Sequence, residues 1–341
     1  MVVAKYPATR GHTTVINNLC KGLSEMGYEM AIGAFSFDED PPFKIKKIVL
    51  NKTKLLKNGI EYLNYDIIHS HQPRVHYYLL TKKPTKPVVF HYHGAANKIQ
   101  EINFKVSMKL YRKRIKKIIS VSKTGVSQIE KMIGSTTADV IYNGADTNFY
   151  NTNLPIPYKK GNPQLLFVSA LHKYKNAGIL INAMSEILKE FPNAHLQIVG
   201  DGEDVPNLKK IINKNNLQNN VELAGKIDNE ELRLRYSSCD IYLSASTFEV
   251  CPVPTLEAMS CGKPLVLFNI SPHREMVESS SAGVLFLNLS KKEISNRISE
   301  VIKKKEYYSK NARIFAEKHD WKNICLQVAK IYEEISWINY N

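Results

Sequence analysis

The sequence predicts an α/β protein built from two doubly wound parallel sheets. Short apolar segments with strand character alternate with segments of helical spacing in both halves of the chain. This alternation is typical of parallel sheets with helices on both faces. The chain has 341 residues, which is too long for one ordinary hydrophobic core and fits two domains of about 150 residues each.

The first series of elements opens with a short strand at 2–5 and a loop at 6–12. A helix is predicted from Thr14 to Met26, because its apolar residues have helical spacing and Gly27 is a typical residue after a helix end. The further strands of this half are expected at 30–35, 67–70, 87–92, 118–122 and 139–142.

A polar, proline-rich segment at 151–163 is expected to link the two series. The second series is predicted to have strands at 165–169, 195–199, 221–224, 241–244, 264–268 and 283–286. We therefore expect one domain over 1–155, a second over 156–320 and a final helical segment over 321–341. Ligands of such sheets bind at the carboxyl ends of the strands, so the cleft between the domains is the expected site.

Composition limits the function classes. The formal net charge of +15 favours anionic partners such as nucleotide phosphates, anionic lipid or nucleic acid. Five cysteines without paired spacing argue against a disulfide framework or a cysteine metal site and indicate reduced thiols. No stretch approaches the roughly 20 apolar residues that cross a bilayer, and the first residues lack a signal-peptide pattern. A cytoplasmic protein is expected.

Part of the basic excess is local. Residues 102–119 interleave lysines and arginines with apolar residues, which predicts a basic amphipathic helix. Two interpretations stay open for it: a solvated face of an ordinary helix, or contact with an anionic membrane on the cytoplasmic face. Nucleic-acid binding is not predicted, because no motif for it is present and no aromatic residues interleave with the basic run.

The stretch Glu249-Val-Cys-Pro-Val-Pro-Thr-Leu-Glu257 contains the strongest functional signal. The prolines place Glu249 in a loop just before a helix. Glu257 is then expected inside that helix, whose first turn offers free backbone N–H groups to an anion. Two carboxylates beside a helix start could hold a molecule with hydroxyls and phosphates; the alternative is two solvated surface acids.

With its neighbours, this stretch resembles the retaining glycosyltransferases of family 4, whose signature is Glu, seven residues, Glu. The resemblance continues through 121–123, 141–146, 196–202, 221–227, 239–244 and 262–266, and covers roughly residues 1–335. It implies the GT-B fold, two Rossmann-like doubly wound domains that face each other across a cleft. It also implies an acceptor-side N-terminal domain, a C-terminal domain that binds a nucleotide-sugar, and a last helix, from Trp321 to Trp337, that crosses back to the N-terminal domain.

The resemblance also implies roles for the glutamates and the helix start. Glu249 would contact the donor sugar near the reacting carbon, and Glu257 would accept hydrogen bonds from the ribose hydroxyls. Main-chain groups around Pro254, Thr255 and Leu256 would contact the sugar and the diphosphate. Pro254 has no N–H, so Thr255 and Leu256 are the expected donors.

Lys175 matches the family's phosphate-binding lysine, and its ammonium would lie against the leaving diphosphate. The arginine usual five positions earlier is Ala170 here. His172 or Lys173 could substitute for it, or the second charge is missing. A solvated lysine is the alternative interpretation of Lys175.

Further positions match the family one by one. Gly11 would let backbone approach the phosphates, although a plain turn glycine is the alternative. His93 would face the donor sugar, although a histidine after a strand is often structural. Gly202 would lie under the nucleotide, and Lys226 with Ile227 would present backbone to the base. His69 and His71 are weaker candidates for the acceptor side.

These matches predict a retaining glycosyltransferase that moves a sugar from a nucleotide-sugar donor to a glycan, a lipid-linked acceptor or another hydroxyl acceptor. No cofactor is expected, since the nucleotide-sugar is a co-substrate. No metal is expected either, because Asp38-Glu39-Asp40 is interpreted as a solvated loop. The altered positions at Ala170 and His12 leave a catalytically inactive binding or scaffold protein of the same fold as the alternative.

Overall fold

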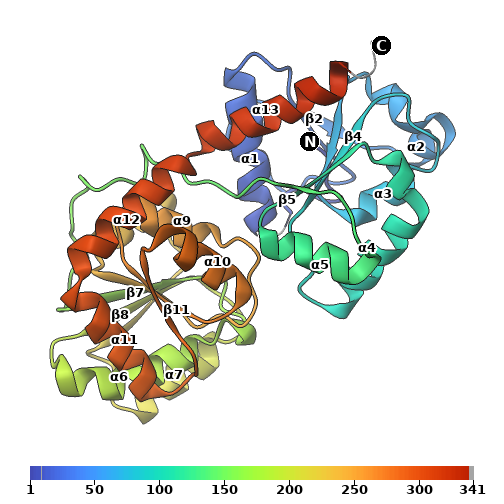
Figure 1. The fold of residues 1–341 in the computed structure, drawn as a ribbon. Coiled ribbons are helices and arrows are strands. Elements are labelled where there is room, and N and C mark those ends of the chain that lie inside the picture. The colour runs from blue at the N-terminus through green and yellow to red at the C-terminus, as the bar shows by residue number, and fades with distance from the viewer. Residues whose placement is uncertain (9, 338–341) are drawn as a thin grey trace. The chain divides into compact units, whose positions relative to one another are not determined.

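The computed structural model describes residues 1–8 and 10–337, with the side chains of Arg10 and Trp337 outside the description. Two compact units make up the chain (Figure 1). The first comprises Met1–Asn143 and the C-terminal segment from Trp321 onward, and the second comprises Gly144–Asp320. The division falls between Asn143 and Gly144, earlier in the chain than the expected boundary at 155.

The sheet of the first unit is parallel and is held together by the segment at its start. The strands are β1 (Ala31–Ala34), β2 (Lys46–Val49), β3 (Ile68–Ser70), β4 (Val88–Tyr92), β5 (Lys117–Ser120) and β6 (Asp139–Val140). β1 pairs with β2, and β3 to β6 pair in sequence order. Residues 1–4 lie between β1 and β3: Val2 N–H donates to His69 O at 2.8 Å, and Val3 N–H donates to Gly33 O at 3.0 Å.

The strands expected from residue 30 onward are present in this half, whereas the segment expected as a strand at 2–5 forms only isolated β-bridges to its neighbours. Two further features were not predicted. Strand β2 is mostly exposed, and its Lys46-Lys-Ile-Val sequence lacks the apolar run of a buried strand. The first helix, α1 (Arg10–Glu25), begins earlier than the expected Thr14. Gly11 and His12 therefore lie in the first turn of α1 and not in a loop.

The remaining helices cover the two faces of this sheet. They are α2 (Lys52–Asn58), α3 (Pro73–Leu79), α4 (Lys98–Tyr111), α5 (Lys123–Ile133) and α13 (Trp321–Trp337), with short 3₁₀ turns η1 (Gly59–Leu63) and η2 (Arg112–Arg114). α13 packs against α1 (Figure 1). A Cβ on Gly22 of α1 would lie 2.5 Å from Cys325 Sγ of α13, so glycine permits this close approach.

The basic amphipathic segment is shorter than the predicted 102–119. α4 ends at Tyr111, and β5 starts at Lys117. Ile115, Ile118 and Ile119 are buried, because they belong to the hydrophobic core beneath the sheet and not to an exposed helix face. A mixture of lysines and isoleucines occurs both in an amphipathic helix and in a strand next to a basic turn. The sequence alone therefore did not distinguish the end of α4 from the start of β5.

The second unit contains a six-stranded parallel sheet of order β12-β11-β10-β7-β8-β9. Its strands are β7 (Gln164–Val168), β8 (His195–Val199), β9 (Val221–Gly225), β10 (Ile241–Ser244), β11 (Leu265–Phe268) and β12 (Gly283–Phe286), each within one residue of the predicted bounds. The order reverses between β7 and β10, as in doubly wound nucleotide-binding sheets.

Helices surround this second sheet. They are α6 (Ala177–Glu190), α7 (Val205–Lys214), α8 (Asn229–Ser238), α9 (Val253–Ser260), α10 (Ser271–Ser280), α11 (Lys291–Lys303) and α12 (Lys305–Lys318), with the 3₁₀ turn η3 (Lys173–Lys175). The fold class is thus confirmed: two Rossmann-like α/β units. Among the described residues of both units, no helix is long and apolar enough to cross a membrane.

Substitution of Gly200 tests the closeness of the loops that follow β7 and β8. Gly200 has φ of +131°, and an added Cβ would lie 1.8 Å from Ser169 O. We expect Gly200→Ala to lower the free energy of unfolding by about 2–4 kcal/mol, measured by urea denaturation. Gly11→Ala is the control, because a Cβ there meets nothing within 4 Å and alanine favours a helix. Equal midpoints for wild type and Gly200→Ala would contradict the geometry.

Candidate functional site

The loops that follow β7 and β10 diverge at the point where the strand order of the second sheet reverses. Such a reversal leaves a crevice at the carboxyl ends of the strands, because the two loops turn to opposite faces. Here the loops remain connected by hydrogen bonds. Thr247 N–H donates to Tyr174 O at 3.0 Å, and Asn176 Nδ2 donates to Ala245 O at 3.0 Å.

Lys175 and Glu249 meet at this place. Lys175 Nζ lies 2.5 Å from Glu249 Oε1, and their side chains are only 13% and 16% exposed. A pair this well shielded from water is screened less than a surface pair. Lys175 and Glu249, both predicted as site residues from the sequence, are thus in contact in the structure although they are far apart along the chain.

Glu257 lies in α9 and points to a group of tyrosines that the sequence did not reveal. Tyr236 Oη donates to Glu257 Oε2 at 2.9 Å, and Tyr150 also hydrogen-bonds to Glu257. Burial raises the pKa of Glu257 to about 7, against the opposing effect of the two tyrosines. The carboxyl group is therefore poised between its charged and neutral forms near neutral pH.

The first turn of α9 offers fewer backbone donors than expected. Thr255 N–H already donates to Pro252 O at 3.2 Å, so this donor is engaged in the structure and its contact with a nucleotide-sugar stays a prediction. Leu256 follows it in the same helix. Pro252 caps α9, and Val253 is its first residue. The N–H of a first helical residue has no acceptor within the helix, which makes Val253 the better candidate.

His273 is a second residue that sequence reasoning missed. It is fully buried in α10, its Nδ1 lies 2.8 Å from Phe268 O, and its Nε2 has no hydrogen-bond partner among the described atoms. Burial lowers the pKa of His273, and nearby Glu249 opposes this shift. A histidine inside Ser-Pro-His-Arg-Glu carries no spacing signal, so only the fold places it near Glu249.

Neither of the two residues that could supply the charge of the missing arginine forms an ion pair with Glu249 among the described residues. Ala170 is the second residue after the end of β7. His172 Nδ1 lies 3.6 Å from Glu203 Oε1, and Lys173 is exposed. Among the described ion pairs, Lys175 alone joins Glu249.

The loops after β8 and β9 complete the carboxyl edge of the second sheet. Leu171 N–H donates to Asp201 O at 2.9 Å, and a Cβ on Gly202 would lie 2.5 Å from Leu171 O. Only glycine fits at position 202 without a shift of the backbone, because the loop after β8 contacts the loop after β7 there. Lys226 is exposed and Ile227 is half-buried, directly after β9 and beside the same edge.

The candidate residues of the first unit form a separate group at the carboxyl ends of its strands. His93 follows β4, and its Nε2 lies 2.9 Å from Nδ1 of His71. The ring of His12 lies 4.5 Å from that of His93, so the first turn of α1 reaches this group. Gly11 is exposed there.

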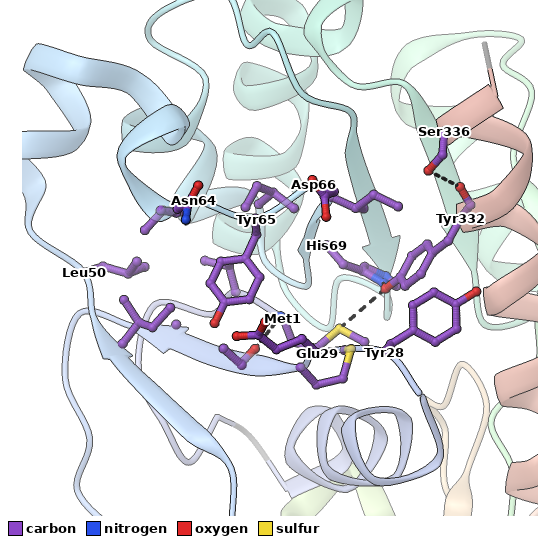
Figure 2. Close-up of a pocket in the computed structure, with 18 of the residues that line it drawn as sticks. Met1, Tyr28, Glu29, Leu50, Asn64, Tyr65, Asp66, His69, Tyr332 and Ser336 are labelled. Atoms are coloured by element: carbon purple, nitrogen blue, oxygen red, sulfur yellow. Dashed lines mark hydrogen bonds between the residues drawn. The ribbon is translucent and has the colours of Figure 1, made fainter. Parts of the chain in front are cut away.

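A cavity of about 350 Å³ lies elsewhere in the first unit. It opens at the amino ends of β1 and β3, between residues such as Leu50, Tyr65 and Tyr332 (Figure 2). None of the predicted donor-contacting residues lines it. Because ligands of doubly wound sheets bind at the opposite, carboxyl ends of the strands, this cavity is not assigned to the same site.

Two family models match the chain in succession. Residues 9–149 match the model described as Glycosyltransferase Family 4. Residues 155–318 match the model described as Glycosyl transferases group 1.

Individual relatives agree with these models. An uncharacterized glycosyltransferase of Methanocaldococcus jannaschii is 28% identical over 97% of this chain and 96% of its own length. Alpha-monoglucosyldiacylglycerol synthase of Acholeplasma laidlawii is 31% identical over 36% of this chain and 30% of its own length. The solved structure of HepE from Anabaena in complex with UDP-glucose has a TM-score of 0.79 and 22% identity, and covers 98% of this chain and 99% of HepE.

The GT-B neighbours show the fold, and the two models and the full-length relative identify the activity class. The chain is a glycosyltransferase of the GT-B fold, similar to those of family 4.

Proposed function

We propose that the second unit binds a nucleotide-sugar and that the enzyme transfers the sugar to a hydroxyl acceptor with retention of anomeric configuration. The observation that carries this proposal is the shielded Lys175–Glu249 pair at the reversal of the strand order. One cation and one carboxylate at that place match a donor with a diphosphate on one side and sugar hydroxyls on the other. The solved complex of HepE with UDP-glucose supports a donor of this class.

Lys175 supplies the charge that departure of the nucleoside diphosphate requires. As the sugar–oxygen bond breaks, negative charge grows on the diphosphate, and a fixed ammonium group stabilises it. In the donor-free protein this ammonium neutralises Glu249. When the diphosphate takes over Lys175, the carboxylate of Glu249 becomes free to accept hydrogen bonds from sugar hydroxyls near the reacting carbon.

Retention follows from attack on the face that the diphosphate leaves. The bond between the anomeric carbon and the diphosphate oxygen breaks, and the acceptor oxygen bonds to the same face of that carbon. The acceptor proton passes to the departing diphosphate, so no external base is consumed. Neither a metal nor another cofactor takes part in this scheme.

Glu257 is proposed to hold the ribose. Its carboxylate accepts from Tyr236 on one side and has further lone pairs for the ribose hydroxyls. Val253 offers its backbone N–H toward the diphosphate at the start of α9. The contact of Leu256 with the diphosphate stays a prediction from the family resemblance. Gly202, Lys226 and Ile227 surround the nucleotide from the neighbouring loops. The roles of Gly11 and His93 toward the donor stay predictions from the family resemblance.

A lipid-linked acceptor at an anionic membrane is the proposed acceptor class. Four large apolar side chains of α4 are 41–66% exposed and follow one another at helical spacing: Ile99, Ile102, Val106 and Leu110. Exposed lysines flank this stripe at 98, 105, 109 and 113. Such a helix favours the boundary between anionic headgroups and acyl chains, and one relative is named for the synthesis of a glucosyldiacylglycerol.

Substitutions at the ion pair test the transfer. We expect Glu249→Gln and Lys175→Met each to lower the transfer rate by about 100-fold or more, because each removes a group that acts on the developing charge or the sugar. The measurement is product formation from a panel of UDP-, GDP- and ADP-sugars. Lys209→Met is the control, since Lys209 is exposed on α7 and should leave the rate unchanged. A wild-type chain that binds nucleotide-sugars without turnover would support the inactive alternative.

The raised pKa of Glu257 predicts a pH-dependent stability. Its folded pKa of about 7 exceeds the usual unfolded value near 4.3. The native state therefore keeps a proton that the unfolded chain releases, and stability is lost as pH rises through this window. We expect Glu257→Gln to be more stable than wild type by about 1–3 kcal/mol at pH 8, with little difference at pH 4.5, while the KM for the donor rises.

Glu222 provides a control for that experiment, because its pKa is shifted in the opposite direction to that of Glu257. Despite its burial, hydrogen bonds from Lys160 and the nearby charge of Arg235 hold the pKa of Glu222 below its usual value. Glu222→Gln should therefore lose stability at pH 8. Urea denaturation at both pH values measures the two variants, and a destabilised Glu257→Gln at pH 8 would contradict the assignment.

Sedimentation with anionic vesicles tests the α4 surface. Neutralising Lys105, Lys109 and Lys113 with glutamine should weaken binding about 100-fold, because each lysine near such a surface contributes about 1 kcal/mol. The same change at Lys209, Lys210 and Lys214 of α7, all exposed, is the control for net charge. Equal losses for both sets would show a general charge effect and contradict docking through α4.

A further inference from the structure

One face of the first sheet carries a stack of histidine side chains. His69 and His71 come from β3 and the residue after it, while His91 and His93 come from β4 and the residue after it. Alternate residues of a strand point to the same face, so all four project toward α1 and α13. The rings of His69, His71 and His91 lie 4.7–5.4 Å apart with interplanar angles of 12–28°.

This stack has unused nitrogen atoms in a buried place. His69, His71 and His91 are 1–2% exposed. Neither ring nitrogen of His91 has a hydrogen-bond partner among the described atoms, and Nε2 of His69 also has none. Buried polar atoms are nearly always paired, so unpaired ones indicate an additional ligand or a bound water.

The geometry is close to that of a three-histidine metal site. One nitrogen from each of these three rings lies within 4.8 Å of the other two, which places each nitrogen at most about 2.8 Å from their common centre. A Zn²⁺ ion needs nitrogen ligands at about 2.0–2.1 Å and lies in the plane of each imidazole that binds it. The nitrogens must therefore move inward by less than about 1 Å, and the rings must also rotate out of their near-parallel stack. His91 can rotate without breaking a hydrogen bond.

Neighbouring groups already orient two of the rings. Tyr332 Oη lies 2.6 Å from His69 Nδ1, which leaves His69 Nε2 directed away from α13. His71 Nδ1 lies 2.9 Å from His93 Nε2. The ligand nitrogen of His71 is therefore Nε2, which must exchange its contact with Met1 Sδ at 3.2 Å for the ion. Histidines that bind metals are held in this way through their second nitrogen.

The cavity at the amino ends of β1 and β3 gives an entry path. His69, Met1 and Tyr332 line its inner wall (Figure 2). Glu29, Asp66 and Glu333 also line it and are exposed. These three carboxylates form an acidic mouth on a chain of net charge +15, and a local field of this sign attracts cations.

We propose that His69, His71 and His91 bind one Zn²⁺ ion, with solvent from the cavity in the remaining position. Three neutral imidazoles and an open position are a donor set that zinc accepts. The ion would join β3 to β4 inside the first unit. It takes no part in the proposed sugar transfer, whose donor-binding residues Lys175, Glu249 and Glu257 lie in the second unit, so each proposal can fail without the other.

The test is calorimetric titration of the metal-stripped full chain with Zn²⁺. We expect binding of one ion per chain, and a rise in unfolding temperature when Zn²⁺ is added, because the ion binds the folded state. His91→Phe should abolish both effects. Phenylalanine keeps the ring stack, and no hydrogen bond is lost, so the variant is expected to fold. His69→Gln is a second variant with the same expected loss.

His172→Ala is the matched control, because His172 with Glu203 is a half-exposed histidine–carboxylate pair that could chelate zinc at the surface. This variant should bind Zn²⁺ like the wild type. Co²⁺ substitution adds a spectroscopic readout: nitrogen ligands give visible bands without thiolate charge transfer, which separates the site from the five buried cysteines. Absence of stoichiometric binding, retained binding in His91→Phe and His69→Gln, or loss in His172→Ala would each overturn the proposal.

Discussion

The ion pair between Lys175 and Glu249 depends on the reversal of strand order in the second sheet. β7 and β10 are adjacent and parallel, so the loops that leave their carboxyl ends start side by side. Lys175 belongs to the first loop and Glu249 to the second. The strand order thus brings together two residues that are more than seventy positions apart in the chain. The loops that follow β8 and β9 lie at the same edge of the sheet and contact each other through Gly200 and Gly225.

The sequence was a good guide wherever hydrophobic pattern and backbone chemistry point the same way. Strands β7, β10 and β11 of the second unit contain continuous apolar runs, and prolines mark the start of α9. The extent of α1 was misjudged, because the loop-like residues Gly11 and His12 continue into its first turn. β2 was missed for a related reason: an exposed edge strand with two lysines has no apolar run.

The candidate site was predictable only in part. Glu249, Glu257 and Lys175 have a recognisable spacing or neighbourhood, but their surroundings come from distant segments. Tyr150, Tyr236 and His273 carry no local signal, and only folding brings them to the two glutamates. Similarly, the position of Thr255 in the first turn of α9 predicts a free N–H donor. Its hydrogen bond to Pro252 O depends on the exact backbone geometry, which the sequence does not reveal.

The packing of α13 on α1 determines the order in which the two units can finish folding. α13 contributes Trp321, Ile324 and Val328 to the core of the first unit, yet it leaves the ribosome after the whole second unit. Domains generally fold as units during synthesis. The second unit, contiguous from Gly144 to Asp320, can therefore finish folding while the first still exposes the face of α1 that carries Gly22. The first unit, although its chain is made earlier, is therefore completed after the second, when α13 covers α1.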